Sequence, residues 1–407
     1  MGECLGLYLH IPFCRSKCDY CDFYSLAGRE DRMDDYQKAL LRHIVESAEA
    51  ARSFSVNSIY IGGGTPTWYG EKRLVELLHT IKRRFTLSKD VEITIEANPD
   101  SVDEKMLRHL RRAGVNRISM GMQSGCDQEL QAVHRPHTYR QVVDAVTAVR
   151  RAKITNLNLD LIYGLPGQTE ESWHKTVEKA LILNPEHLSC YGLTVEEGTP
   201  LAQRVARGEQ LPDEDQQAAL YLWTVKRLAE AGYEQYEISN FAKRGYQSRH
   251  NMKYWMGHPY MGLGAAAHSD FGGRRYSFLS DLDQYIDHML QGDAVVDESE
   301  QITRRERGSE YLMLRMRTVH GIEEWEYRRE YMMNFEPIAA KLAEFEQRGW
   351  ARRRGRRWQF TPEGFLLSNQ LIGQLWELQE NASLGGMLER VRRNREAQQE
   401  NKESKES

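Results

Sequence analysis

The chain has 407 residues, of which 40% are hydrophobic and 28% charged, and its formal net charge is −4. This composition is that of an ordinary globular protein of roughly two or three domains, and the small negative charge excludes a general binder of nucleic acid. Six cysteines are too few for a disulfide framework, and the first residues lack the basic and apolar regions of a signal peptide. No stretch approaches the roughly 20 apolar residues that span a bilayer. We therefore expect a cytoplasmic protein whose thiols remain reduced.

Short apolar or alternating runs, each followed by an amphipathic stretch, recur through the first half of the chain. The predicted strands cover residues 5–10, 58–61, 91–96, 117–122, 156–162 and 187–193, and the predicted helices cover 34–51, 71–84, 103–113, 140–151 and 170–183. This alternation predicts parallel βαβ units in an α/β fold. Six units fit either an open sheet or a partial barrel. Both architectures place functional residues at the carboxyl ends of the strands.

The pattern changes from about residue 291. Residues 303–317 and 336–348 read as amphipathic helices, 349–360 as a basic hairpin turning at Gly355, and another helix begins at Thr361. Helices followed by a two-stranded wing predict a small winged-helix-like domain. The last residues are too polar to bury a core and predict a solvated tail. The expected domains are therefore 1–290 and 291–376, with a flexible charged tail at 377–407.

Three cysteines follow the first predicted strand with the spacing C-x3-C-x2-C: Cys14, Cys18 and Cys21. A [4Fe–4S] cluster normally takes four thiolates, so three thiolates would leave one iron without a protein ligand. Such an iron can bind a small molecule, as a catalytic zinc does at its open position. A structural zinc site usually shows paired C-x2-C units, and no second pair is present. The spacing favours a cluster over a zinc site or isolated buried cysteines.

A glycine turn, Gly62-Gly63-Gly64, follows the second predicted strand. Glycines lack Cβ atoms, so the backbone can approach a ligand closely or adopt a positive φ. The turn matches neither a dinucleotide fingerprint nor a phosphate loop, and glycine turns are common without any function. Because it lies one βα unit after the cysteines, its backbone could bind an amino group on a ligand of the open iron.

Polar side chains lie at the ends of the next predicted strands. Glu96 ends the third strand, and Asp160 interrupts the fifth just before a Gly/Pro turn. A carboxylate is costly to bury unpaired, so each is either a ligand-binding group or a salt-bridged strand end. Gln123 and Arg135 follow the fourth strand, where an amide and a fixed cation could hold a carboxylate or a ribose.

The cysteine loop, the turn at Gly62–Pro66, Glu96 and the Asp160 segment together resemble the radical S-adenosylmethionine superfamily. The resemblance implies that the open iron binds the amino and carboxylate groups of S-adenosylmethionine. The cluster of that family donates an electron and cleaves the sulfonium to a 5′-deoxyadenosyl radical. The implied fold is a partial (β/α)6 barrel, which fits the six units counted above.

A narrower resemblance covers about residues 4–376. The chain is similar to the oxygen-independent coproporphyrinogen III oxidase (HemN) group at residues 8–14, 121–124, Arg135, 158–160 and in the C-terminal domain. The residues that this resemblance places around the cluster-bound S-adenosylmethionine are Tyr8, Tyr20 (through its backbone), Gly63 and Glu96. Those that it places around a second S-adenosylmethionine molecule are Gly64, Thr65, Gln123, Arg135 and Asp160.

Two departures distinguish the chain from the oxidases. Asp22-Phe23 stands where they carry a small residue and a fourth cysteine, and the first strand begins at about residue 4, which leaves no room for their N-terminal extension. Both features are similar to the HemW branch of the family, as is the H-N-x-x-Y-W motif at His250–Trp255. That resemblance implies a haem chaperone that transfers haem to acceptor proteins. Coproporphyrinogen III oxidation, or another radical reaction, is the alternative.

His250 is the candidate haem ligand, because neutral imidazole binds haem iron well. Its rivals are His10 and His268, and an isolated histidine is more often a hydrogen-bonded polar residue. The neighbouring aromatics at 254 and 255 could stack on a porphyrin or belong to the core. The arginine cluster at 352–357 reads as a solvated hairpin that could dock an acidic partner or, as a peripheral contact, anionic lipid. The oligomeric state stays open.

Overall fold

The computed structural model describes residues 3–380. These residues form two compact units. The first contains the chain up to Tyr254 and His258–Ile302, and the second contains Trp255–Gly257 and the described residues from Thr303 onward. We expected the second domain to start at residue 291, whereas the second unit resumes at Thr303.

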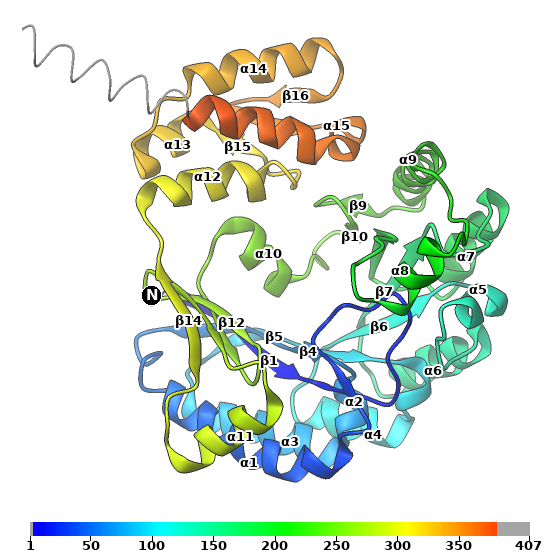
Figure 1. Cartoon of the computed structure of the whole chain (residues 1–407), viewed down its shortest axis with the longest axis vertical. Coiled ribbons are helices and arrows are strands. Elements are labelled where there is room, and N and C mark those ends of the chain that lie inside the picture. Colours follow the sequence, from blue (N-terminus) through cyan, green and yellow to red (C-terminus); the bar gives the residue numbers. More distant parts are fainter. Residues whose placement is uncertain (1–2, 381–407) are drawn as a thin grey trace, which may run out of the picture. The chain divides into compact units, whose positions relative to one another are not determined.

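Six parallel strands form the centre of the first unit, in the spatial order of their sequence (Figure 1). They are β1 (Cys4–Ile11), β4 (Ser55–Gly63), β5 (Leu87–Ala97), β6 (Arg117–Gln123), β7 (Asn156–Tyr163) and β8 (His187–Gly192). The helices that connect them are α1 (Met33–Ser47), α3 (Glu71–Arg84), α4 (Glu104–Arg112), α6 (Tyr139–Arg151) and α7 (Glu170–Ile182). These helices cover the outer face of the curved sheet, which confirms the predicted partial (β/α)6 barrel.

The alternation of side chains in each strand explains this arrangement. In β1, Leu5, Leu7 and Leu9 are fully buried in the same core as Leu40 of α1. Tyr8 and its alternate neighbours point to the opposite, inner face of the sheet. The helices also begin where the sequence indicates, since Thr138 and Thr169 form capping boxes at the starts of α6 and α7. One face of each strand therefore builds the core, and the other is free to carry polar groups.

Further strands widen the sheet to twelve. On the β1 edge lie β11 (Tyr260–Leu263), β12 (His268–Phe271), β13 (Arg274–Phe278) and β14 (Val296–Gln301), and on the β8 edge lie β10 (Asn240–Ala242) and β9 (Glu234–Gln235). The remaining strands and α-helices of this unit are β2 (Phe13–Cys14), β3 (Leu26–Ala27), α2 (Pro66–Tyr69), α5 (Asp127–Ala132), α8 (Pro200–Ala206), α9 (Glu214–Glu230) and α11 (Leu282–Gln291), with α10 (Arg249–Met256) ending in the second unit. Because β14 pairs with β13, residues 296–301 belong to the first unit.

The second unit is the winged-helix-like domain that the sequence predicts. Its elements are α12 (Arg304–Arg315), β15 (Ile322–Glu323), α13 (Glu324–Tyr331), α14 (Glu336–Gln347), β16 (Ala351–Arg354), β17 (Arg357–Phe360) and α15 (Pro362–Leu366). The strands form a sheet in the order β15-β17-β16, and the wing turns at Gly355, whose φ is 60°. Residues 368–380 are helical, and Gln379 is buried against Tyr327. From residue 381, the expected tail lies outside the described residues.

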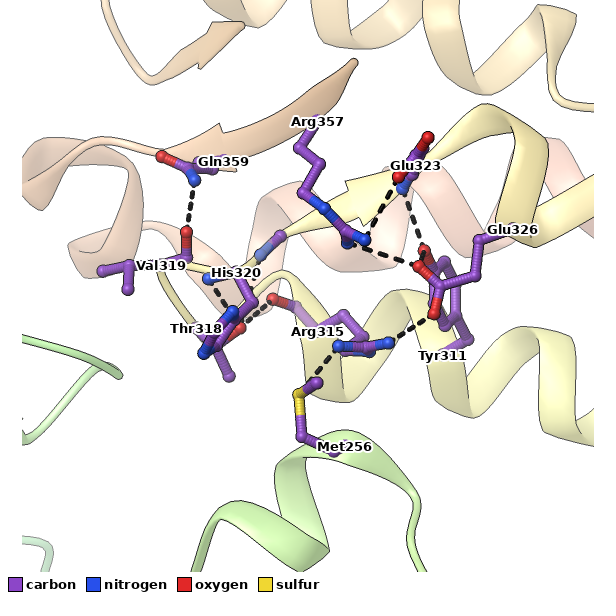
Figure 2. Close-up of polar contacts among 11 residues, drawn as sticks. Met256, Tyr311, Arg315, Thr318, Val319, His320, Glu323, Glu326, Arg357 and Gln359 are labelled. Carbon is purple, nitrogen blue, oxygen red and sulfur yellow. Dashed lines mark hydrogen bonds and ion pairs between the residues drawn. The ribbon is translucent and has the colours of Figure 1, made fainter. Parts of the chain in front are cut away.

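A buried polar cluster holds this unit together (Figure 2). Arg315 is 7% exposed and lies between Glu326 and Met256, whose sulfur is 2.7 Å from Nη1. Glu326 also accepts hydrogen bonds from the Tyr311 hydroxyl at 2.9 Å and from Arg357 at 3.3 Å. Within residues 3–380, the helices are all too short or too polar to cross a membrane.

Candidate functional site

The cysteine loop leaves the carboxyl end of β1 and is fixed at both sides. The Cys21 N–H donates to the Cys18 carbonyl at 3.1 Å, and the Asp19 N–H donates to the Val133 carbonyl at 3.3 Å. The Asp19 carboxylate accepts a hydrogen bond from Arg204 at 2.6 Å. The three cysteines are free thiols, and burial raises the pKa of Cys14 and Cys21. The loop therefore presents the three sulfurs from a fixed backbone.

The three cysteines line one pocket with a volume of about 350 Å³. The pocket also contains nearly all of the residues that the sequence suggested for S-adenosylmethionine, namely Tyr20, Gly63, Gly64, Thr65, Glu96, Gln123, Arg135 and Asp160. Tyr8 is the exception, since it does not line the pocket, and its hydroxyl is hydrogen bonded to Nδ1 of His10 at 2.9 Å. Residues separated by more than 140 positions in sequence thus meet where the strands end.

The glycine turn packs directly against the start of the cysteine loop. The Gly64 and Thr65 N–H groups donate to the carbonyls of Ile11 and Phe13, both at 2.8 Å. A Cβ on Gly64 would lie 2.6 Å from the Phe13 carbonyl oxygen. Gly63 has a φ of 115°, and a Cβ there would meet the His10 ring. These glycines are therefore required by close backbone packing around the pocket.

Glu96 is held by two neutral donors. The Tyr60 hydroxyl donates to Oε1 at 2.7 Å, and the Gly63 N–H donates to Oε2 at 3.0 Å. Burial nevertheless raises the pKa of Glu96 to about 7. Burial also raises the pKa of Asp160, whose oxygens accept hydrogen bonds from Asn158 and Ser119. Burial therefore favours the protonated form of both carboxyl groups more than exposure to solvent would.

Gln123 and Arg135 leave unmet hydrogen-bonding capacity in the pocket. Gln123 adopts a φ of 61°, which is unusual for a residue other than glycine, and its buried Oε1 has no partner among residues 3–380. Arg135 donates to Asn98 at 2.8 Å and to the Cys18 sulfur at 3.3 Å, while its Nε has no partner in the described chain. A polar ligand could satisfy both orphaned atoms.

His250 lies on α10 and is fully buried. Its Nδ1 is hydrogen bonded to Ser58 at 3.0 Å and its Nε2 to Tyr254 at 2.8 Å, and the ring stacks on Tyr60 at 5.3 Å. Burial lowers the pKa of His250 to about 3, so the ring is neutral. Both nitrogens are used within the protein in this conformation, and the next residue, Asn251, lines the pocket instead.

The two rival histidines differ in their environments. His10 is buried, with Nδ1 hydrogen bonded to Tyr8 and Nε2 to the Tyr24 carbonyl, both at 2.9 Å. Burial lowers its pKa to about 4. His268, at the start of β12, is exposed. Neither residue lines the pocket of the cysteines.

Several lining residues were not among the sequence-based candidates. They are Tyr60, Arg117, Ser119, Asn158, Ser189, Tyr191 and Asn251. Three of them precede a predicted site residue on the same strand at two-residue intervals: Arg117 and Ser119 precede Gln123, and Asn158 precedes Asp160. The two-residue period of a β-strand could have identified them once Gln123 and Asp160 were placed inside the barrel.

The chain is similar in sequence to proteins of known families. Residues 8–180 match the Radical SAM superfamily, and residues 302–367 match the HemN C-terminal domain. The protein named "Heme chaperone HemW" of Bacillus subtilis (strain 168) is 33% identical over 369 residues, which cover 90% of this chain and 97% of the relative. The protein of the same name from Escherichia coli (strain K12) is 34% identical over 370 residues, with the same coverage.

A solved structure is similar over most of the chain. Coproporphyrinogen III oxidase (HemN) from Escherichia coli, described as a radical SAM enzyme, has a TM-score of 0.81 and 25% sequence identity. The similarity covers 92% of this chain and 90% of that one. Together with the pocket and the two domain matches, these relatives show that the chain belongs to the HemW family, within the radical SAM superfamily.

Proposed function

We propose that this protein is a haem chaperone, which binds haem and passes it to acceptor proteins. We further propose that Cys14, Cys18 and Cys21 hold a [4Fe–4S] cluster with an exchangeable S-adenosylmethionine on its open iron. The observation that carries the second part is the single pocket shared by three free thiols and the predicted S-adenosylmethionine residues. The first part rests on the family and on relatives that are named heme chaperones.

The residues of the pocket fit the cluster and S-adenosylmethionine. Thiolates are soft ligands that suit iron–sulfur clusters, and the three on this loop leave one position open. The orphaned atoms of Gln123 and Arg135 are available to a polar ligand, and Glu96 can accept a hydrogen bond from an amino group once it is ionised. When bound, the cluster would supply an electron to the sulfonium. The chain itself contributes fixed donors and acceptors around the pocket.

An apolar rim favours haem as the cargo. Phe23 is 68% exposed and Tyr191 is 40% exposed, and both line the pocket. Exposed large apolar side chains beside a cavity are typical of binding surfaces, and aromatic rings can pack against a porphyrin plane. Phe23 also stands at the position where the resemblance to the oxidases implies a fourth cysteine.

A second candidate function is oxidation of coproporphyrinogen III. The similarity to the HemN structure supports it, since that protein is a coproporphyrinogen III oxidase with closely related architecture. The absent fourth cysteine argues against it. We also propose that the protein works in the cytoplasm, because clusters held by free thiolates need a reducing compartment.

An anaerobic haem titration separates the two candidates. Protein with a reconstituted cluster should shift the Soret band of haem and saturate at an equimolar amount. A parallel sample with S-adenosylmethionine, a reductant and coproporphyrinogen III should form no protoporphyrinogen. An unchanged Soret band would reject the chaperone proposal, and formation of protoporphyrinogen would establish the enzyme instead.

A further inference from the structure

Arg117 is a buried cation with two guanidinium nitrogens that lack a hydrogen-bond partner among residues 3–380. It is the first residue of β6, is 1% exposed and lines the pocket of the cysteines. Its Nε and Nη1 atoms are buried without a hydrogen-bond partner among residues 3–380, and the guanidinium forms no ion pair in this part of the chain. A buried charge without compensation is costly, so its retention calls for a function.

The nearby carboxyl groups of Glu96 and Asp160 attract Arg117, but within residues 3–380 neither accepts a hydrogen bond from its Nε or Nη1 atoms. The oxygens of Glu96 accept from the Tyr60 hydroxyl and the Gly63 N–H. Those of Asp160 accept from Asn158 at 2.8 Å and from Ser119 at 3.3 Å. Both carboxyl groups thus accept from neutral donors, and burial raises the pKa of each although Arg117 acts in the opposite direction. The Nε and Nη1 donors of Arg117 remain without a hydrogen-bond partner in the described chain.

The register of the sheet places Arg117 at the inner end of the pocket. Arg117 pairs with Thr94, while Ser119, two residues later, is level with Glu96. Arg117 begins β6 and Gln123 ends it, and six residues of a strand span about 20 Å. Because the cysteine loop follows the carboxyl ends of these parallel strands, Arg117 faces the pocket from the end that is remote from the loop.

We propose that Arg117 binds a carboxylate of a small molecule held in the pocket. A guanidinium presents a planar fork of donors that matches a carboxylate, and the low dielectric of a buried site strengthens this contact. The carboxylate comes either from a propionate of the porphyrin or from the methionyl group of a second S-adenosylmethionine molecule, because the carboxylate of the first would bind the open iron at the cysteine loop. This inference rests on the proposed function, which assigns both ligands to the pocket.

Arg117→Met is the first test, because it removes the charge and keeps the length of the side chain. If the function of Arg117 is to bind a ligand, the ligand-free variant should unfold at the same temperature as the wild type or at a higher one. The reason is that the substitution removes a buried cation with unsatisfied donors. The matched control is Arg315→Met, which removes a buried arginine that has partners in the second unit. That control should lower the unfolding temperature and leave ligand binding unchanged.

Binding is then measured anaerobically on the full chain with its cluster, using two pairs of probes. The first pair is haem and its dimethyl ester, and the second is S-adenosylmethionine and its decarboxylated form. In Arg117→Met, one carboxylate-bearing probe should lose about ten- to a hundredfold in affinity, while its carboxylate-free counterpart binds as to the wild type. Arg117→Lys should recover part of the loss. The pair that responds identifies the source of the carboxylate.

The outcomes separate this inference from the proposed function. If the wild type binds the probes and Arg117→Met binds all four equally well, the role of Arg117 is wrong while the proposed function stands. If both members of a pair lose affinity equally, Arg117 has a structural role and the inference is overturned. The same conclusion follows if the variant unfolds at a lower temperature and shows no selective loss of affinity for a carboxylate-bearing probe. If the wild type binds neither haem nor S-adenosylmethionine, both the inference and the proposed function fail.

Discussion

Tyr60 donates a 2.7 Å hydrogen bond to Glu96 from the neighbouring strand, so a neutral hydroxyl supports a carboxyl group on the wall of the pocket. The pKa of Glu96 still rises from 4.5 to about 7, chiefly because of burial, with a smaller contribution from Asp160. This side chain therefore titrates near neutral pH, where the protein would bind its ligands.

The raised pKa predicts a specific pH dependence of stability. The folded protein binds a proton at Glu96 more tightly than the unfolded chain does, so the contribution of Glu96 to stability falls as pH rises from about 4.5 to about 7 and is then constant. Glu96→Gln lacks this contribution. Its stability relative to the wild type should therefore increase across the same interval, as measured by denaturant unfolding without cluster or ligand. The surface variant Glu344→Gln should show no such trend, and a flat difference for Glu96→Gln would contradict the assignment.

The barrel could be predicted from the sequence because its strands carry their information locally. In β1, alternate leucines face the core, and α3 occupies the residues that the amphipathic pattern indicated. The strands beyond β1 and β8 lack this signal. β14 consists entirely of exposed residues, and β9 and β10 are only two and three residues long, so their pairing depends on the existing sheet edge.

The parts of the candidate site that carry a sequence motif could be predicted, whereas the parts that depend on contacts in the folded chain could not. The cysteine spacing and the polar strand ends identified the pocket, but no local pattern indicates the positive φ of Gln123. Likewise, the partners of His250 come from β4 and from its own helix. Arg117 shows the same limit, because its two unsatisfied nitrogens are a property of the folded barrel.

The cysteine assignment predicts a selective loss of the cluster. Cys14→Ala, Cys18→Ala and Cys21→Ala should each abolish stable incorporation of iron and sulfide. The loop offers only three thiolates, so each substitution leaves a second iron without a protein ligand. Iron and sulfide analysis with visible absorption after anaerobic reconstitution measures the effect. Cys126→Ala is the control, since this cysteine is free but does not line the pocket. Full iron content in a variant lacking all three loop cysteines would disprove the site.

Gly64 should tolerate no side chain. In Gly64→Ala the new Cβ would lie 2.6 Å from the Phe13 carbonyl oxygen, so the backbone next to Cys14 must shift, at a cost of about 1–3 kcal/mol. We expect lower stability and weaker cluster incorporation, measured by denaturant unfolding and iron analysis. Gly373→Ala is a matched control, because its Cβ meets nothing within 4 Å in a helical segment. That control should be neutral or stabilising by up to about 1 kcal/mol.

His250 can coordinate haem iron only if it gives up a hydrogen bond, because Ser58 and Tyr254 occupy both ring nitrogens. Tyr254→Phe removes the partner of Nε2 and keeps the aromatic ring. If His250 is the axial ligand, this variant should bind haem severalfold more tightly, since the nitrogen no longer has to leave a hydroxyl.

His250→Phe completes the test, because it removes the imidazole and retains a ring against Tyr60. The ligand role predicts that His250→Phe loses the low-spin spectrum of haem bound through a histidine, measured by absorption and electron paramagnetic resonance. His268→Ala serves as the comparison, because this rival histidine is exposed. If Tyr254→Phe leaves haem affinity unchanged and His250→Phe keeps the wild-type spectrum, the ligand lies elsewhere. The buried ring would then be a structural link between α10 and β4.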